Sequence, residues 1–345
     1  MSPLQFIQDM PKVELHIHLE GAIEPATLLL LADRNHVALP GDTIDALRTW
    51  YQFSDFSHFI DVYLTIQRCL RSADDFSLIA YELGADMARQ NIWYREATVT
   101  PYSHLWQNKG TAAEDIIDGL EDGRRRARRD FDVEIRWIMD IPRNLPPPAA
   151  ERTAQLAIDW ANQGVVALGL GGNEATSPPG QFAPYFEKAL AAGLHSAPHA
   201  GETAGPASVW AALRELKAER LGHGVRSIED PELLAYLKAE QVPLEVNPSS
   251  NVCLKVYRNI EQHPIVHLIK MGLLVTVNSD DPPLFDTTLT EEFAKLLNTF
   301  ELDTGDLETL TLNAARSAFL PVDQRDALEA DIALEFKRLR RLSLS

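Results

Sequence analysis

The chain has 345 residues, of which 45% are hydrophobic and 24% charged, a balance typical of a globular protein with a substantial core. Its net charge of −18 argues against an extended nucleic-acid surface, because affinity for phosphates depends on lysine and arginine side chains. The basic run RRRARR at 124–129 is flanked by acidic residues and is typical of a solvated helix face.

Short runs typical of strands recur along the chain, separated by longer segments of helical character. The first run is followed by a long stretch, about 22–90, that is rich in helix formers and aromatic residues. In chain order the eight runs are VELHIHL (13–19), NIWYREATVTP (91–101), VEIRWIMDIP (133–142), VVALGLGG (165–172), HSAPHAGE (195–202), AERLGHG (218–224), VPLEVNPSSN (242–251) and LLVTVNSDDP (273–282).

Strands that alternate with helices predict a parallel α/β architecture, and eight repeats favour a closed (β/α)8 TIM barrel over an open sheet. No low-complexity linker divides the sequence, so we expect one domain over residues 1–345. The extra helices of the 22–90 insertion could form a lid over the barrel mouth. Most of their aromatic side chains are expected to pack as ordinary core.

The sequence also predicts where the protein resides. Two cysteines, Cys69 and Cys253, lie far apart without the spacing of a metal site, so we expect reduced thiols. The N-terminal residues lack the basic start and apolar core of a secretory signal, and LLLLA at 28–32 is too short to span a bilayer. We therefore expect a cytoplasmic protein with no nucleic-acid or membrane partner. The sequence carries no signal for an oligomeric state.

Polar residues gather at the ends of the predicted strands, in HIHLEG, PHAGE, LGHG, NPSSN and NSDDP. Catalytic groups of such barrels lie at these carboxyl ends. His16 and His18 share one strand face because they are two residues apart. Zinc prefers imidazole nitrogen and carboxylate oxygen, so the candidate ligands are His16, His18, His199 and one of Asp280 or Asp281.

Three further groups remain beside this predicted metal site: Glu202, His223 and the second aspartate. Zinc lowers the pKa of a bound water from about 15.7 towards about 7. A carboxyl group, an imidazole and an aspartate beside such a water are what a hydrolytic deamination needs. One deprotonates the water, one protonates the ring nitrogen and one orients the substrate.

The motifs HIHLEGAI, PHAGET, RLGHG, PSSN and NSDDP together resemble the adenosine deaminase family of the amidohydrolase superfamily. The resemblance follows the family's order over essentially the whole chain. It implies a barrel that holds one zinc ion per chain and replaces the 6-amino group of a purine with oxygen, releasing ammonia. The zinc ligands that it implies are His16, His18, His199 and Asp280.

The resemblance also implies roles for the residues around the purine. Glu202 resembles the acid that protonates purine N1, and His223 the residue that activates and orients the water. Asp281 would hydrogen-bond N7, and the backbone N–H of Gly172 would meet N3. His18 is expected to border the substrate as well as the metal.

Glu20 bears on the choice of substrate. Adenosine deaminases generally have HLDG where this chain has HLEG, and HLEG is common among adenine deaminases that act on the free base. RLGHG is adenosine-like, because free-base enzymes usually have a DHG motif there. A third class of relatives acts on 6-aminodeoxyfutalosine, an adenine nucleoside with a benzoate on its 5′ side. Such a substrate would reconcile the free-base-like HLEG with the adenosine-like RLGHG.

A substrate that bears a carboxylate favours an arginine in the site, because a guanidinium group can donate to both carboxylate oxygens. Arg143, in DIPRN after the third predicted strand, and Arg68 are the candidates, and plain surface charges are the alternative. Thr98 stands in the second strand where the family often has an arginine. We therefore predict a zinc-dependent deaminase of adenosine or of a 5′-modified adenosine such as 6-aminodeoxyfutalosine. The alternatives are an adenine deaminase and a non-catalytic purine-binding barrel, which the complete ligand set disfavours.

Overall fold

The computed structural model describes residues 2–54, 56–108 and 110–344. Within these residues eight parallel strands form a sheet in which each strand pairs with the next one along the chain. Each predicted strand-type run overlaps one of them. The strands are β1 (Lys12–His18), β2 (Ile92–Val99), β3 (Glu134–Pro142), β4 (Val165–Gly171), β5 (His195–Ala200), β6 (Leu221–His223), β7 (Leu244–Val246) and β8 (Val275–Val277).

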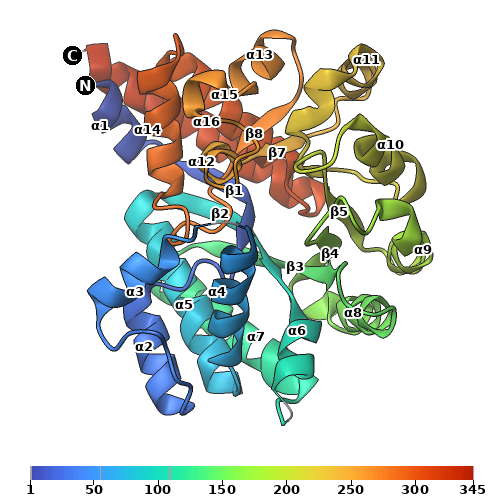
Figure 1. Ribbon diagram of the computed structural model, residues 1–345. Coiled ribbons are helices and arrows are strands. Elements are labelled where there is room, and N and C mark those ends of the chain that lie inside the picture. Colours follow the sequence, from blue (N-terminus) through green and yellow to red (C-terminus); the bar gives the residue numbers. More distant parts are fainter. Residues whose placement is uncertain (1, 55, 109, 345) are drawn as a thin grey trace.

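The sheet closes on itself where the loop after β8 meets β1. The backbone N–H of His18 donates to the carbonyl of Asp280 at 2.9 Å, and the N–H of Asp280 donates to the carbonyl of His16 at 3.2 Å. The N–H of Leu15 donates to the side chain of Asn278 at 2.8 Å. The predicted (β/α)8 TIM barrel is therefore confirmed, with helices around the strands (Figure 1).

In the described part of the segment between β1 and β2 the chain forms four helices, so the predicted extra helices after the first strand are confirmed (Figure 1). They are α2 (Pro25–Arg34), α3 (Ile44–Tyr51), α4 (Phe56–Arg68) and α5 (Ala73–Gln90). The other α-helices are α1 (Pro3–Asp9), α6 (Pro101–Gln107), α7 (Ala113–Phe131), α8 (Pro148–Asp159), α9 (Ala183–Ala191), α10 (Pro206–Glu215), α11 (Pro231–Glu240), α12 (Pro248–Cys253), α13 (Ile265–Lys270), α14 (Leu289–Thr299), α15 (Thr304–Ser317) and α16 (Val322–Leu344).

The two ends of the chain lie side by side in Figure 1, where α1 runs next to α16. Phe6 stacks on Phe336 with 6.2 Å between the ring centroids, which ties these two helices together. Among the described residues, no helix has the length and apolar character needed to cross a membrane.

The strands are buried on both faces, as expected for a parallel sheet covered by helices. In β1 every residue is buried except the last, His18, which is only partly buried. β6, β7 and β8 contain three residues each: β6 ends at His223 itself, and Asn247 and Asp280 lie in the loops that follow β7 and β8. These short strands place polar side chains at the barrel mouth rather than in its core.

Candidate active site

The four predicted metal ligands meet at the carboxyl ends of β1, β5 and β8. Nε2 of His18 lies 3.2 Å from Nε2 of His199 and 3.3 Å from Oδ1 of Asp280. Nε2 of His16 lies 3.6 Å from the same carboxylate oxygen. Ligand atoms of the three histidines lie within 4.8 Å of one another, as do those of His16, His223 and Asp280. Residues from distant parts of the chain thus form one compact cluster.

The protonation states of His199 and Asp280 suit a divalent cation, whereas His16 carries a proton that a cation would displace. Burial lowers the pKa of His16, but Asp280 and Glu245 outweigh burial and raise that pKa to about 10. Burial lowers the pKa of His199 well below its usual value, and the neighbouring histidines lower it further, so its imidazole is neutral. Burial opposes ionisation of Asp280, yet the hydrogen bond and charge of His16 outweigh it and hold the pKa of that carboxyl below its usual range. Neutral imidazole and ionised carboxylate are the forms that bind metals.

The orientation of His16 turns one ring nitrogen, Nε2, toward the metal cluster. Its Nδ1–H donates to Oε2 of Glu245 at 2.9 Å, whereas its buried Nε2 has no hydrogen-bond partner among the described residues. A carboxylate on the second ring nitrogen is the usual support of a metal-binding histidine, because it fixes the tautomer and the ring plane. The donor set therefore fits a metal ion.

His223 lies beside this cluster, and the side-chain amides of two asparagines fix the orientation of its ring. Its Nδ1 accepts from the side chains of Asn247 at 3.2 Å and Asn251 at 3.1 Å. Its Nε2 lies 3.8 Å from both Glu202 and Asp280. Burial lowers the pKa of His223 to about 3, so the ring is neutral. Because Nδ1 accepts, Nε2 carries the proton and points toward the two carboxyl groups.

Glu202 follows β5 in a loop that another glutamate holds in place. The carboxylate of Glu174 accepts the backbone N–H groups of Gly201, Glu202, Thr203 and Ala204 at 2.5 to 3.1 Å. Burial, and then the charge of Asp280, raises the pKa of Glu202 to about 8. At neutral pH Glu202 is therefore a proton donor.

A cavity of about 330 Å³ opens above the cluster, a size typical of small-molecule sites. His18, Glu202, His223 and Asp281 all line it. One side of α4 forms a wall, through residues spaced at helical intervals from Phe59 to Gln67. The insertion after β1 thus borders the site directly. The cavity residues of α4 are Phe59, Ile60, Tyr63, Leu64 and Gln67.

Asp281 and Gly172, both predicted as purine contacts, also line the cavity. Burial, and then the charge of Asp280, raises the pKa of Asp281 well above its usual value. Its Oδ1 has no hydrogen-bond partner among the described residues. A Cβ on Gly21 would fall 1.6 Å from that oxygen, so only glycine fits there. Gly172 has a φ of +101°, a conformation that glycine adopts readily.

Glu20, by contrast, is fully buried and does not line the cavity. One of its oxygens accepts the backbone N–H of Thr100 at 3.0 Å and the Nε2–H of His104 at 2.9 Å. Its other oxygen accepts the hydroxyl of Tyr63 at 3.4 Å. The structure therefore places Glu20 between β1, α6 and α4, behind Tyr63, which lines the cavity.

Neither predicted arginine reaches the cavity. The guanidinium of Arg143 is buried and donates to the backbone carbonyls of Leu170 at 2.9 Å and His199 at 2.7 Å. Arg68 is exposed at the end of α4, where it donates to the hydroxyl of Thr65. Both carbonyl contacts use Nη2, whereas the buried Nε of Arg143 has no hydrogen-bond partner among the described residues. The carboxylate-binding role of Arg143 stays a prediction.

Asp140 is a cavity residue that the sequence reasoning missed. It lies near the end of β3, is 3% exposed, and its Oδ1 has no hydrogen-bond partner among the described residues. Burial raises its pKa to about 7. The sequence could have indicated Asp140, because it is a carboxylate near the carboxyl end of the strand-type run VEIRWIMDIP. Catalytic groups of such barrels lie at the carboxyl ends of strands.

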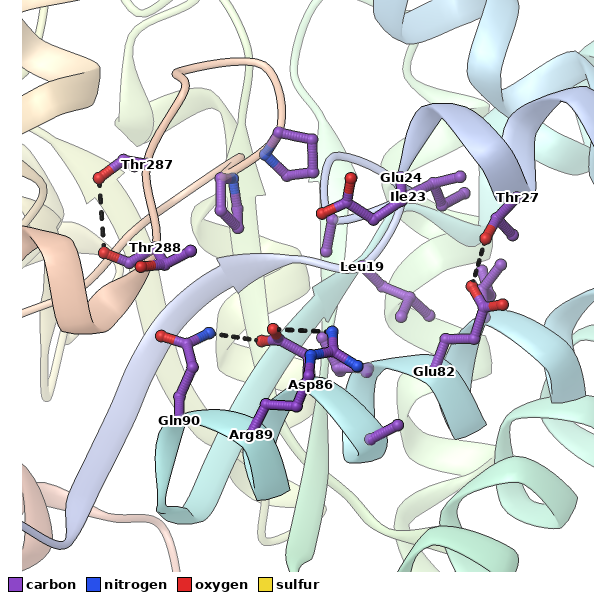
Figure 2. A pocket seen from close by; sticks show the side chains of 16 residues that line it. Leu19, Ile23, Glu24, Thr27, Glu82, Asp86, Arg89, Gln90, Thr287 and Thr288 are labelled. Carbon is purple, nitrogen blue, oxygen red and sulfur yellow. Dashed lines mark hydrogen bonds and ion pairs between the residues drawn. The ribbon is translucent and has the colours of Figure 1, made fainter. Parts of the chain in front are cut away.

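A second cavity, of about 370 Å³, lies behind the loop after β1 and is bordered by α2 and α5 (Figure 2). Its polar side chains pair with one another: Thr27 donates to Glu82 at 2.6 Å, and Asp86 accepts from Gln90 at 2.7 Å and Arg89 at 3.2 Å. None of the predicted site residues lines it. This cavity therefore has no part in the candidate active site.

A (β/α)8 barrel with a histidine and aspartate cluster at its mouth is the architecture expected of an amidohydrolase. The family model described as adenosine deaminase matches residues 11–334. The chain belongs to the adenosine deaminase family. It is a hydrolytic deaminase, which cleaves the C–N bond of a cyclic amidine.

Relatives with names or solved structures cover nearly the whole chain. The chain is 43% identical to an aminodeoxyfutalosine deaminase of Streptomyces coelicolor, over 94% of this chain and 85% of that one. An adenine deaminase from Arthrobacter aurescens has a TM-score of 0.90 at 30% identity, over 95% and 99% of the two chains. An amidohydrolase from Burkholderia ambifaria with bound Zn has a TM-score of 0.91 at 28% identity, over 98% and 94%.

Proposed function

We propose that this protein is a zinc-dependent deaminase of 6-aminodeoxyfutalosine, converting its purine to the 6-oxo form with release of ammonia. The observation that carries the proposal is the 43% identity to an aminodeoxyfutalosine deaminase over 94% of the chain. The structural likeness to an adenine deaminase, at 30% identity, favours the free base as the second candidate substrate.

We assign the metal to His16, His18, His199 and Asp280. The unpartnered Nε2 of His16, the facing nitrogens of His18 and His199 and the ionised Asp280 support this assignment. One zinc ion in this set supplies the Lewis acidity that lowers the pKa of a water molecule to near neutrality. The amidohydrolase of known structure with bound Zn supports zinc as the metal.

We assign the proton transfers to residues at the cavity floor. Glu202, protonated at neutral pH, donates to purine N1 and so makes C6 electrophilic. His223, fixed by Asn247 and Asn251, orients the attacking water through its Nε2. The oxygen of the water adds to C6, one water proton restores the carboxyl group of Glu202, and the other converts the exocyclic amino group to ammonia, which leaves as the bond between C6 and this nitrogen breaks.

The purine itself is held by Asp281 and Gly172 in this proposal. Burial and the charge of Asp280 raise the pKa of Asp281, which favours the protonated carboxyl group, and a protonated carboxyl group donates to N7, which only accepts. The backbone N–H of Gly172 donates to N3. His18 borders the ring from the metal side, since it lines the cavity.

The test is a deamination assay on protein stripped of metal by a chelator and reloaded with one equivalent of zinc. Absorbance is followed with adenine, adenosine and 6-aminodeoxyfutalosine, and kcat/KM is compared. We expect zinc to restore activity and 6-aminodeoxyfutalosine to give the highest kcat/KM. A higher value for adenine would establish the second candidate instead. Zinc-loaded protein that turned over none of the three would refute both.

A further inference from the structure

The cavity has an unusual feature at its rim: a large aromatic side chain that remains exposed. Trp106 lines the cavity, yet 54% of its surface is accessible. Its indole makes no hydrogen bond or ring contact with the other described residues. An exposed indole beside an active site is an unused stacking surface, because each aromatic face gains free energy when a flat ring covers it.

Helix α6 fixes the backbone from which this indole projects. Ser103 and Trp106 lie three residues apart, hence on the same side of the helix, and both line the cavity. The same helix is anchored to the loop after β1, because Glu20 accepts hydrogen bonds from the backbone N–H of Thr100 and from Nε2–H of His104. A ring that docks on Trp106 therefore meets a side chain whose backbone is already positioned at the cavity rim.

The cavity walls contributed by α4 and the loop after β3 are uncharged and largely apolar, with the amides of Gln67 and Asn144 as polar groups. Ile60 and Leu64 come from α4, and Leu145 from the loop after β3. Among the described residues that line the cavity, none is a lysine or an arginine. These walls suit an uncharged flat group, whereas the metal cluster and its acids lie at the floor. The acid end of an arylated substrate has no cation to meet inside and would extend to the exposed rim.

We infer that Trp106 is the specificity platform of the enzyme, stacking on an aromatic group attached to the 5′ side of the nucleoside. This inference rests on the proposed function, in which that group is the benzoate ring. Adenine and adenosine carry no such ring, so they gain nothing from Trp106. Stacking on Trp106 would let the enzyme prefer the arylated nucleoside over adenine and adenosine without any charged contact.

The test compares Trp106→Ala and Trp106→Phe with the parent enzyme on 6-aminodeoxyfutalosine and adenosine. We expect Trp106→Ala to lower kcat/KM for 6-aminodeoxyfutalosine about tenfold or more, mainly through KM, with adenosine unchanged within about twofold. Trp106→Phe should recover most of the loss. The matched control is Tyr236→Ala, which removes an exposed aromatic ring of α11 that does not line the cavity.

Equal losses on both substrates would overturn the inference, since they would indicate a displaced α6 rather than a lost stack. An unchanged kcat/KM for 6-aminodeoxyfutalosine would overturn it too. If the parent enzyme fails to deaminate this substrate, the proposed function fails, and the platform is judged by binding of 5′-O-benzoylinosine instead. There, a Kd about tenfold higher in Trp106→Ala supports the platform, and an equal Kd refutes it.

Discussion

Two carboxyl groups of the candidate site, Glu202 and Asp280, have pKa values shifted in opposite directions. Burial raises the pKa of Glu202 to about 8, whereas His16 holds the pKa of Asp280 below its usual range against the effect of burial. Opposite shifts of this kind separate a proton donor from a permanent anion within one site. The sequence shows both acids, but only their surroundings assign the two roles.

The donor role of Glu202 predicts the behaviour of Glu202→Gln. The amide keeps the size of the side chain but cannot give up a proton to purine N1. We expect kcat to fall by about 10²- to 10⁴-fold while the metal content, measured by atomic absorption, stays at the parent level. The exposed Glu240→Gln on α11 is the control and should leave kcat unchanged. Turnover at the parent rate in Glu202→Gln would remove Glu202 as the acid.

How well the sequence predicts the position of a site residue depends on the length of its side chain. Histidines and aspartates at strand ends are short, so the position of the backbone nearly fixes where they point, and the structure brings His16, His18 and Asp280 together. Arg143 also follows a strand end, but its long side chain turns back to the carbonyls of Leu170 and His199. No sequence pattern specifies that turn.

At the scale of elements, Glu20 connects three segments that are remote in the sequence. It joins the end of β1 to α6 through Thr100 and His104, and to α4 through Tyr63. The partners lie 43 to 84 residues further along the chain, so the motif HLEG alone suggested a substrate contact. Two walls of the cavity therefore depend on one buried carboxylate.

This connection predicts that Glu20→Asp acts on the whole cavity. Shortening the side chain by one methylene leaves part of the buried network unsatisfied, which costs about 1–3 kcal/mol of unfolding free energy. We expect kcat/KM to fall by a similar factor for adenosine and 6-aminodeoxyfutalosine, measured beside urea unfolding. Glu24→Asp, exposed four residues later, is the control. A changed preference between the substrates at parental stability would instead reveal direct contact between Glu20 and the substrate.

At the scale of the whole molecule, the repeating pattern of the sequence predicts the barrel but not the charged network inside it. Arg220, directly before β6, donates to Glu245 of β7 at 2.6 Å, to Glu96 of β2, and to the carbonyl of Ser317 at 2.7 Å. Glu245 also accepts the Nδ1–H of His16. The ion pairs therefore link distant strands across the barrel and end at the candidate metal cluster.

Arg220→Met tests whether this network supports both the fold and the site. The variant keeps the apolar stem but leaves the carboxylates of Glu96 and Glu245 buried without their cation, because Arg220 is 1% exposed. Breaking a buried pair in this way costs about 3–5 kcal/mol. Urea unfolding of metal-free protein should show this loss, whereas Arg214→Met, which removes an exposed guanidinium over Trp210, should cost less than about 1 kcal/mol.

Arg220→Met should also weaken zinc binding. Glu245 fixes the ring of His16, and the substitution removes the guanidinium that holds Glu245 in place. Loss of such support typically lowers metal affinity about 10- to 100-fold. Zinc affinity is measured by competition with a chromophoric chelator at a temperature where Arg220→Met is fully folded. A destabilised variant with parental zinc affinity would show that Glu245 orients His16 without help from Arg220. A variant of parental stability would show that the barrel tolerates both carboxylates unpaired.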